Sequence, residues 1–295
     1  MMDDARAGPL APWVASRAGR VWVSLALFAV GLVVGVPAYT GLPSQGLVLA
    51  YRYGLPALWA ALALLATRIM PLRPFRPVLW SLFGVSLGLG LAYALGGWPL
   101  EALGLSTATP RGAAVAKLSE AIPMYGAILL ATLLAGRGLG PLSLRGGRLG
   151  LSLALGLLSA VPLVAYVALA PDAKALARTP AATVLAWLPW VALFSAANGL
   201  LEELWFRGAW FGTFREAVGA PAAMHVTSLS FAVWHVIIYW GEPAVLLLLW
   251  PVFLYLGYAY AGIVRKTGSL WGAVLGHTLA DVLFLLVTFA TSHAL

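Results

Sequence analysis

Apolar residues dominate this chain in long runs, and polar residues are confined to short stretches between them. Most runs are close to the length of about 20 residues that an α-helix needs to cross a bilayer. No segment alternates apolar and polar positions in the repeated pattern of a membrane β-barrel. The runs predict membrane-spanning helices at about 21–39, 47–67, 77–97, 119–135, 149–170, 182–204, 221–240, 244–261 and 269–290.

Composition places the chain in the same class. Of its 295 residues, 62% are apolar and 9% are charged, whereas soluble domains carry about 25% charged residues. We therefore predict an all-α, polytopic helical membrane protein, with about 8–9 transmembrane helices in a single membrane domain over 1–295. The lower count applies if the run at 119–135, where Glu120 and Pro123 lie at the start, enters the membrane without crossing it.

Basic residues outside the runs fall mainly on one side of the predicted membrane. When the intervening segments are numbered alternately, thirteen Lys or Arg lie on the first side and four on the other. Cytoplasmic loops carry the excess of basic residues, so we expect a cytoplasmic N-terminus and an external C-terminus. The first side holds Arg6, Arg17, Arg20, Arg68, Arg73, Arg76, Arg137, Arg145, Arg148, Arg207, Arg215, Arg265 and Lys266, and the other holds Arg111, Lys117, Lys174 and Arg178.

The net charge of +8 does not indicate nucleic-acid binding. The basic residues are those of loops, and no basic patch is interleaved with aromatic residues on a soluble segment. The chain has no cysteine, which excludes disulfides, thiol nucleophiles and cysteine metal sites. The Arg-, Ala- and Gly-rich composition is typical of a GC-rich genome, so we expect a bacterial cytoplasmic membrane and the lipid bilayer as a partner.

Ionisable residues within a membrane are costly and are functional candidates. In "EELWFR", Glu203 and Arg207 are four residues apart with the acid first, the favourable order for an ion pair on a helix. Glu202 points about 100° away around the helix and lacks that partner. One carboxylate can therefore be structural and the other a base. The alternative is a helix that ends near 204, so that all three charges meet water.

Two further stretches place histidines inside predicted helices. In "FAVWH", His235 shares a helix face with Phe231, and in "GHTLAD", His277 and Asp281 are four residues apart and can meet. Asp281 is then expected to fix the ring of His277, as carboxylates behind a working histidine do. Without a catalytic role, His235 is a hydrogen-bonded core histidine, and His277 with Asp281 is a buried pair that neutralises itself.

The three stretches can meet only if the helix that carries Glu202 continues past 204. If it stopped there, Glu202 would lie at the cytoplasmic surface, on the order of 13–20 Å below the two histidines at a rise of 1.5 Å per residue. No proline occurs between 190 and 218, and only three glycines weaken a helix there. We therefore predict that the helix continues through Arg207 to about 214 and buries the Glu203–Arg207 pair.

Together these segments resemble the CPBP family of membrane proteases, which includes CAAX proteases and bacteriocin-processing or abortive-infection proteins. "EELWFR", "FAVWH" and "HTLAD" match EExxxR, FxxxH and HxxxN/D in the family's order and at roughly its spacing. The resemblance covers about 180–290 and implies scaffold helices in 1–180 and a CPBP-like catalytic core in 181–290. It implies an intramembrane endopeptidase that acts on a peptide or protein substrate in a membrane-embedded cavity.

The resemblance also implies a role for each motif residue. Glu202 is the general base that activates the attacking water, and His235 helps to hold that water. His277 and Asp281 bind the oxyanion, and Arg207 locks Glu203. The commoner family residue at position 281 is Asn. An ionised Asp cannot donate a hydrogen bond, so Asp281 has to be protonated or to act only by orienting His277.

No cofactor is favoured. Glu202, His235 and His277 would also form a two-His-one-Glu set for zinc or another divalent metal, but no HExxH motif is present. A glutamate-activated water needs the same three residues without a metal.

Two other functions remain open from the residues. One is an ion-coupled membrane transporter in which these groups relay protons, and the other is a non-catalytic membrane assembly protein in which the charges lock helices together. A transporter is expected to show broken helices in matching halves, whereas here the polar residues gather in one third of the chain.

Overall fold

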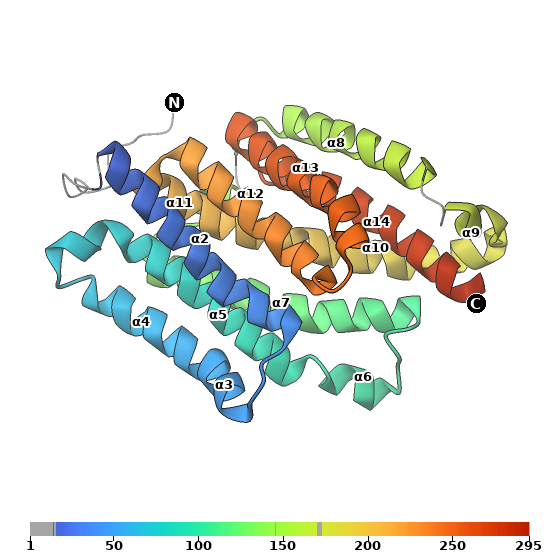
Figure 1. Cartoon of the computed structure of the whole chain (residues 1–295), viewed down its shortest axis with the longest axis horizontal. Helices are drawn as coiled ribbons and strands as arrows, with labels where there is room; N and C mark the ends of the chain where they lie inside the picture. The colour runs from blue at the N-terminus through green and yellow to red at the C-terminus, as the bar shows by residue number, and fades with distance from the viewer. Residues whose placement is uncertain (1–13, 15, 145, 170–172, 295) are drawn as a thin grey trace.

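The computed structural model describes residue 14 and residues 16–144, 146–169 and 173–294. Within these ranges the chain is helical and has no strand, and its helices form one elongated bundle (Figure 1). Nine helical segments of the described chain are long and apolar enough to cross a membrane. These findings confirm the predicted class, and the segment at 110–134 is one of the nine. The chain is an integral membrane protein.

The first half of the chain forms one side of the bundle, where α5 packs closely against α7 (Figure 1). The close approach requires glycine, because a Cβ at Gly84 or Gly88 of α5 would collide with Ala131 or Met124 of α7. The elements of this half are α2 (Arg17–Thr40), α3 (Gln45–Leu49), η1 (Ala50–Gly54), α4 (Leu55–Leu65), η2 (Met70–Phe75), α5 (Arg76–Leu95), α6 (Trp98–Leu103) and α7 (Pro110–Leu134).

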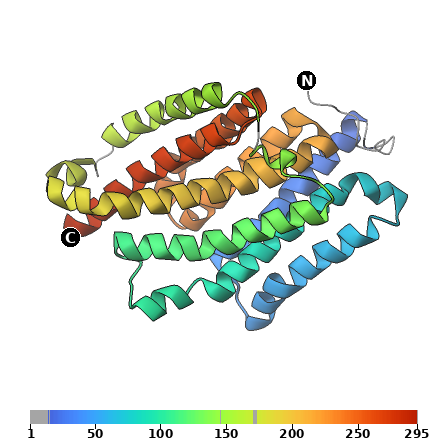
Figure 2. The same ribbon diagram turned by 180° about the vertical axis from the view of Figure 1, so that it is seen from behind.

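The second half forms the other side, and α10 lies along both α7 and α14 (Figure 2). α14 also packs closely against α8, and their backbones are in contact. A Cβ on Gly156 of α8 would lie 2.2 Å from the carbonyl oxygen of Gly272 on α14. The elements are η3 (Gly140–Leu142), α8 (Leu149–Leu169), α9 (Ala173–Arg178), α10 (Ala181–Glu203), η4 (Leu204–Trp210), α11 (Phe211–Val218), α12 (Ala220–Val236), η5 (Ile237–Tyr239), α13 (Pro243–Thr267) and α14 (Trp271–Ala294).

The helix that carries Glu202 does not stop at 204. α10 continues through η4 into α11, which gives one helical segment of 38 residues, Ala181–Val218, so the predicted continuation is confirmed. It ends where Gly219 adopts a positive φ of 86°, which glycine tolerates. The seven residues of η4 are π-helical, a local widening of the helix that often marks functional sites. No residue pattern in 204–210 predicts this π-helical turn.

This continuation changes the charge count. Arg207, one of the thirteen basic residues assigned to loops, is instead buried in the helix, and Arg6 and Arg145 lie outside the described residues. Ten of the thirteen remain at that end of the bundle. On the other side, Arg111 and Lys117 belong to the first turns of α7, so the excess at the first end persists. We call the connections 66–69, 135–148, 219 and 268–270 the basic-loop end.

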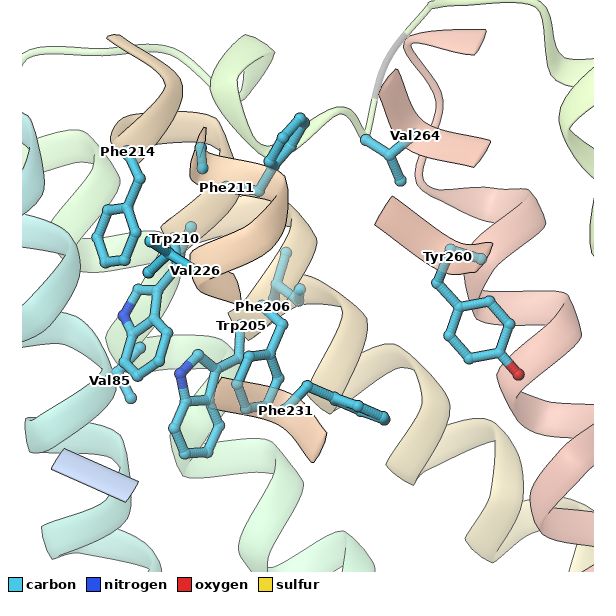
Figure 3. Close-up of a cluster of buried hydrophobic side chains, with 14 of the residues drawn as sticks. Val85, Trp205, Phe206, Trp210, Phe211, Phe214, Val226, Phe231, Tyr260 and Val264 are labelled. Carbon is cyan, nitrogen blue, oxygen red and sulfur yellow. The ribbon is translucent and has the colours of Figure 1, made fainter. Parts of the chain in front are cut away.

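Aromatic side chains fill the interior between Glu202 and the basic-loop end. The side chains of η4 and α11 stack in pairs, with ring centroids 4.9 Å apart for Trp205 and Phe206 and 5.7 Å apart for Trp210 and Phe214. Each of them, and Phe211, is at most 1% exposed (Figure 3). We call these five residues the aromatic cluster. The part of the helix after Glu203 is therefore packed in the core. The polar groups Glu202 and Glu203 lie on the side of the cluster away from the basic-loop end.

Candidate active site

The predicted ion pair between Glu203 and Arg207 is present and buried. Arg207 Nη1 donates to Glu203 Oε1 at 2.8 Å, and both side chains are 0% exposed. Arg207 Nη2 donates to the carbonyl oxygen of Gly257 on α13 at 3.1 Å, and the guanidinium lies 4.3 Å from the ring centre of Phe231. A buried pair needs further contacts to offset its desolvation, and here the Gly257 carbonyl on α13 and the Phe231 ring on α12 supply two, while Glu203 Oε2 and Arg207 Nε have no hydrogen-bond partner among the described residues.

His277 is held by the same carboxylate. Its Nδ1 lies 2.8 Å from Glu203 Oε1, and because an ionised carboxylate only accepts, Nδ1 is the donor. The ring stacks on Tyr260 at 5.4 Å and is 3% exposed. Its Nε2 is left to face Glu202 Oε2 at 3.8 Å.

The prediction that Asp281 fixes the ring of His277 is therefore corrected. Asp281 Oδ1 lies 3.8 Å from His277 Nε2, and its other oxygen accepts a hydrogen bond from Asn198 Nδ2 at 2.8 Å. The spacing of four residues does place Asp281 and His277 on one face of α14. The neighbouring helix α10, however, brings Glu203 closer to the ring than Asp281 comes.

His235 reaches Glu202 from α12. Its Nδ1 lies 2.8 Å from the carbonyl oxygen of Phe231, one turn earlier, and because a carbonyl only accepts, Nδ1 donates. Its Nε2 lies 3.2 Å from Glu202 Oε2, and the ring stacks on Phe253 at 4.5 Å. His235 is thus anchored like a core histidine on one nitrogen, while the other nitrogen is directed at the acid.

Glu202 is the point where the three predicted groups converge. Its Oε2 lies between His235 Nε2 and His277 Nε2, and the residue is 4% exposed. This buried oxygen accepts no hydrogen bond from the described residues, and Arg207 is engaged by Glu203 instead. The two adjacent glutamates therefore stand in different surroundings, as the helical spacing predicted.

The three groups line a cavity of about 260 Å³. Side-chain exposure rises from 5% at Glu202 and 4% at His277 to 19% at His235 and 17% at Asp281, so the acid lies at the inner end. The lining residues are Lys117, Phe194, Asn198, Glu202, Phe231, Trp234, His235, Ile238, Phe253, Leu256, His277, Ala280, Asp281, Phe284 and Leu285.

Two polar lining residues were missed by the sequence analysis. Asn198 precedes Glu202 by four residues, so helical spacing could have placed it on the same face. Lys117 was assigned to a loop segment, yet it lies on α7, where Nζ is 2.5 Å from Glu120 Oε2 and 5.4 Å from the ring centre of Phe194. No pattern within 110–134 relates it to residues on α10 and α14.

The structure does not group Glu202, His235 and His277 as the ligands of one metal ion. Among the residues that the structure describes, no three His, Asp or Glu side chains are grouped as ligands of one ion. His277 Nδ1 is engaged by Glu203 and His235 Nδ1 by a backbone carbonyl, which directs Nε2 of each ring at Glu202; metal-ligating histidines are anchored in the same way, so this contact does not distinguish the two mechanisms. No step through a metal is derived from this geometry, and metal independence stays a prediction.

Comparison with known protein families gives a match for the second half of the chain. Residues 184–283 match the family described as Rce1-like, Type II CAAX prenyl endopeptidase Rce1-like. No curated protein and no solved structure gave a match. The matched segment runs from the start of α10 into α14 and contains Glu202, His235, His277 and Asp281. It does not include Lys117, which comes from the first half of the chain.

Proposed function

We propose a reaction from one premise: residues 184–283 belong to the CPBP, or CAAX-protease, family of membrane endopeptidases, which are hydrolases. In this chain, Glu202 activates the water that attacks the peptide bond, inside the cavity between α7, α10, α12 and α14. The observation that supports this reaction best is the convergence of His235 Nε2, at 3.2 Å, and His277 Nε2, at 3.8 Å, on one buried oxygen of Glu202.

The attacking water binds on the cavity side of Glu202 and His235, within reach of both Oε2 and Nε2. Because His235 Nδ1 donates to the Phe231 carbonyl, Nε2 of the neutral ring has a free lone pair and accepts one hydrogen of the water. The other hydrogen is directed at Glu202 Oε2, which removes it as the water oxygen attacks the carbonyl carbon. Glu202 then returns this proton to the leaving nitrogen, so it acts first as general base and then as general acid.

The oxyanion of the tetrahedral intermediate needs donors on the opposite side of the water. His277 Nε2 can donate only when the ring carries both protons, because Nδ1 already donates to Glu203. Asn198 supplies a second donor: one N–H of its amide is used by Asp281 at 2.8 Å, and the other remains for the substrate. Asp281 thus positions Asn198, which accounts for an acid at a place where the family commonly has Asn.

The test of this mechanism is Glu202→Gln, which keeps the shape and removes the base. We expect cleavage of a peptide mixture by the purified protein in liposomes to fall by about 10²–10⁴-fold, the usual contribution of a general base. Glu101→Gln, on the exposed surface of α6, is the matched control and should cleave like the wild type. If Glu202→Gln cleaves as fast as the wild type while folded, the proposed role of Glu202 is wrong.

Chelation tests the metal-free form of the mechanism. Because Glu202 and the two histidines suffice to hold and activate the water, 1,10-phenanthroline and EDTA should leave the cleavage rate unchanged. Metal analysis of the purified protein should find less than one equivalent of any divalent ion. Loss of cleavage that added Zn²⁺ restores would show instead that these residues hold a metal.

A further inference from the structure

We infer that the substrate reaches this site from the membrane face opposite the basic-loop end, so the enzyme cleaves apolar peptide segments presented on the extracytoplasmic side. The inference rests on the proposed function for the identity of the site as proteolytic. The direction of access follows from three observations that do not depend on the reaction: where the bundle is packed, where the cavity widens, and how charge is distributed between the two ends.

Packing closes the path from the basic-loop end. The aromatic cluster occupies the helix directly after Glu202 and Glu203, and each of its side chains is at most 1% exposed (Figure 3). Arg207 and Tyr260, both 0% exposed, fill the remaining space beside it. From Glu202 to Val218 this packed segment is about 24 Å long at 1.5 Å per residue. A peptide from that side would have to displace this close-packed aromatic core.

The cavity widens in the other direction. Along α12 and η5 its lining begins at Phe231, passes His235 and ends at Ile238, which is 52% exposed and lies one residue before η5 ends at Tyr239. On α10 the lining residues Phe194 and Asn198 precede Glu202, toward the start of that helix.

The helices that contribute these residues run in opposite directions, so both trends point to the same end of the bundle. The start of α10 and the end of α14 meet there, beside α9 (Figures 1 and 2). Lys117, seven residues into α7 from Pro110, lies on the same side of Glu202. Exposure therefore increases continuously from Glu202 to the end of the bundle that lacks the basic loops.

Charge indicates which membrane face this is. Ten described Lys and Arg residues remain at the basic-loop end, whereas the opposite end holds four, Arg111, Lys117, Lys174 and Arg178, together with the acids Glu101, Glu120 and Glu242. Since basic residues are retained on the cytoplasmic side, the mouth of the cavity faces outward. Its volume of about 260 Å³ limits the length of chain it holds, and its lining is mostly apolar, so it accepts a short, mainly apolar stretch of an exported or membrane-anchored chain.

The absence of cysteine from the sequence makes a direct test possible. Single cysteines at the cavity mouth, Ile238→Cys and Phe284→Cys, are treated in intact cells with a membrane-impermeant maleimide, before and after permeabilisation. Glu242→Cys marks the end near the mouth and Lys266→Cys the basic-loop end; both native side chains are exposed. Each variant is first shown to be monodisperse in detergent. A thiol facing lipid does not ionise and reacts slowly, so labelling reports contact with water.

We expect Ile238→Cys, Phe284→Cys and Glu242→Cys to be labelled in intact cells and Lys266→Cys only after permeabilisation. Labelling of the two cavity positions only after permeabilisation, or in neither state, would overturn the inference, as would labelling of Lys266→Cys in intact cells. Adding Glu202→Gln to each variant should leave the labelling unchanged, because access does not require catalysis. Loss of cleavage with unchanged labelling therefore separates the site's chemistry from its accessibility, and inactive wild type with outward labelling would contradict only the proposed function.

Discussion

Glu202 and Glu203 are adjacent in the sequence and have separate tasks because their side chains leave the helix in different directions. Glu203 accepts from both Arg207 and His277, so one carboxylate fixes a guanidinium and an imidazole together. Glu202 accepts no hydrogen bond at Oε2 from the described residues and faces the cavity. Glu203 therefore has a structural role, and the adjacent Glu202 is available for catalysis.

Removing Arg207 should destabilise the protein strongly. Arg207→Met leaves Glu203 buried without its partner, which typically costs about 3–5 kcal/mol, and we expect a matching fall in the thermal unfolding temperature in detergent. In Glu203→Gln/Arg207→Met the unpaired charge is gone, so the double variant should be more stable than Arg207→Met alone. Arg137→Met is the control, since its pair with Glu216 is 29% and 25% exposed and is worth about 0–1 kcal/mol. Equal stability of Arg207→Met and Arg137→Met would contradict this account.

The role assigned to Asp281 predicts different outcomes for two substitutions. Asp281→Asn keeps an oxygen that accepts from Asn198 Nδ2 and adds a donor, so its cleavage rate should equal or exceed that of the wild type. Asp281→Leu removes the acceptor and lets Asn198 turn from the oxyanion, with an expected loss of about 10²–10³-fold in kcat. KM should change less than kcat, because the contact is made mainly in the transition state. A slow Asp281→Asn variant would show that the carboxylate itself is required.

At the scale of elements, the site depends on how closely α14 approaches α10. A Cβ on Gly199 would lie 2.9 Å from Thr278 Oγ1 and 3.1 Å from the amide nitrogen of Thr278, so nothing larger than glycine fits one turn before Glu203. Thr278 adjoins His277 in the chain. The distance between the acid and the imidazole is therefore controlled by backbone contact between two helices.

Gly199→Ala should separate His277 from Glu202 and Glu203. Because the new methyl meets a backbone atom that cannot move alone, we expect the cleavage rate to fall by more than about tenfold, as small displacements of catalytic groups cost large factors. Gly126→Ala on α7, where a Cβ would have no neighbour within 4 Å, should leave activity unchanged and improve helix stability slightly. Equal activity of the two variants would show that the close approach is not needed.

Sequence reasoning predicted the helices well where the signal is local. The length of apolar runs located the spans, and the lack of proline between 190 and 218 correctly extended the helix through Arg207. The π-helical turn in η4 was not predictable. Helix propensities do not distinguish a backbone hydrogen bond to the fifth preceding residue, as in a π-helix, from one to the fourth, as in an α-helix. Glu203 outcompeted Asp281 for His277 because spacing within α14 carries no information about which carboxylate a neighbouring helix supplies.

At the scale of the whole molecule, the first half supports the helix that carries the acids. We propose that 1–180 act as a scaffold for a core in 181–290, even though the family match covers only 184–283. Polar contacts join α5 and α7, and the loop after α7, to that helix at three levels. They are Tyr125 Oη to the carbonyl oxygen of Ala197 (2.6 Å), Ser81 Oγ with Thr213 Oγ1 (3.1 Å) and Arg137 Nη1 to Glu216 Oε2 (2.5 Å).

Splitting the chain after Gly138 tests this dependence. Gly138 is exposed and lies in a connection at the basic-loop end, so the fragment 1–138 keeps four spans and 139–295 keeps five, each in its original orientation. We expect 139–295 alone to be inactive and unstable in detergent. Co-expression of both fragments should restore cleavage, since helices that are stable in the membrane can associate without a covalent link. Activity of 139–295 alone would show that the scaffold is dispensable.

The chain of contacts from Arg207 through Glu203 to His277 has a consequence for how such an enzyme is restrained. Every link is a hydrogen bond between buried side chains, and close-packed rings surround it, so these contacts hold the groups in one arrangement. Cleavage by a protease with such a fixed site has to be controlled by access of substrates to the cavity. Substrate specificity is then set by which peptide segments can leave the lipid or the external solution and enter a narrow, apolar cavity mouth.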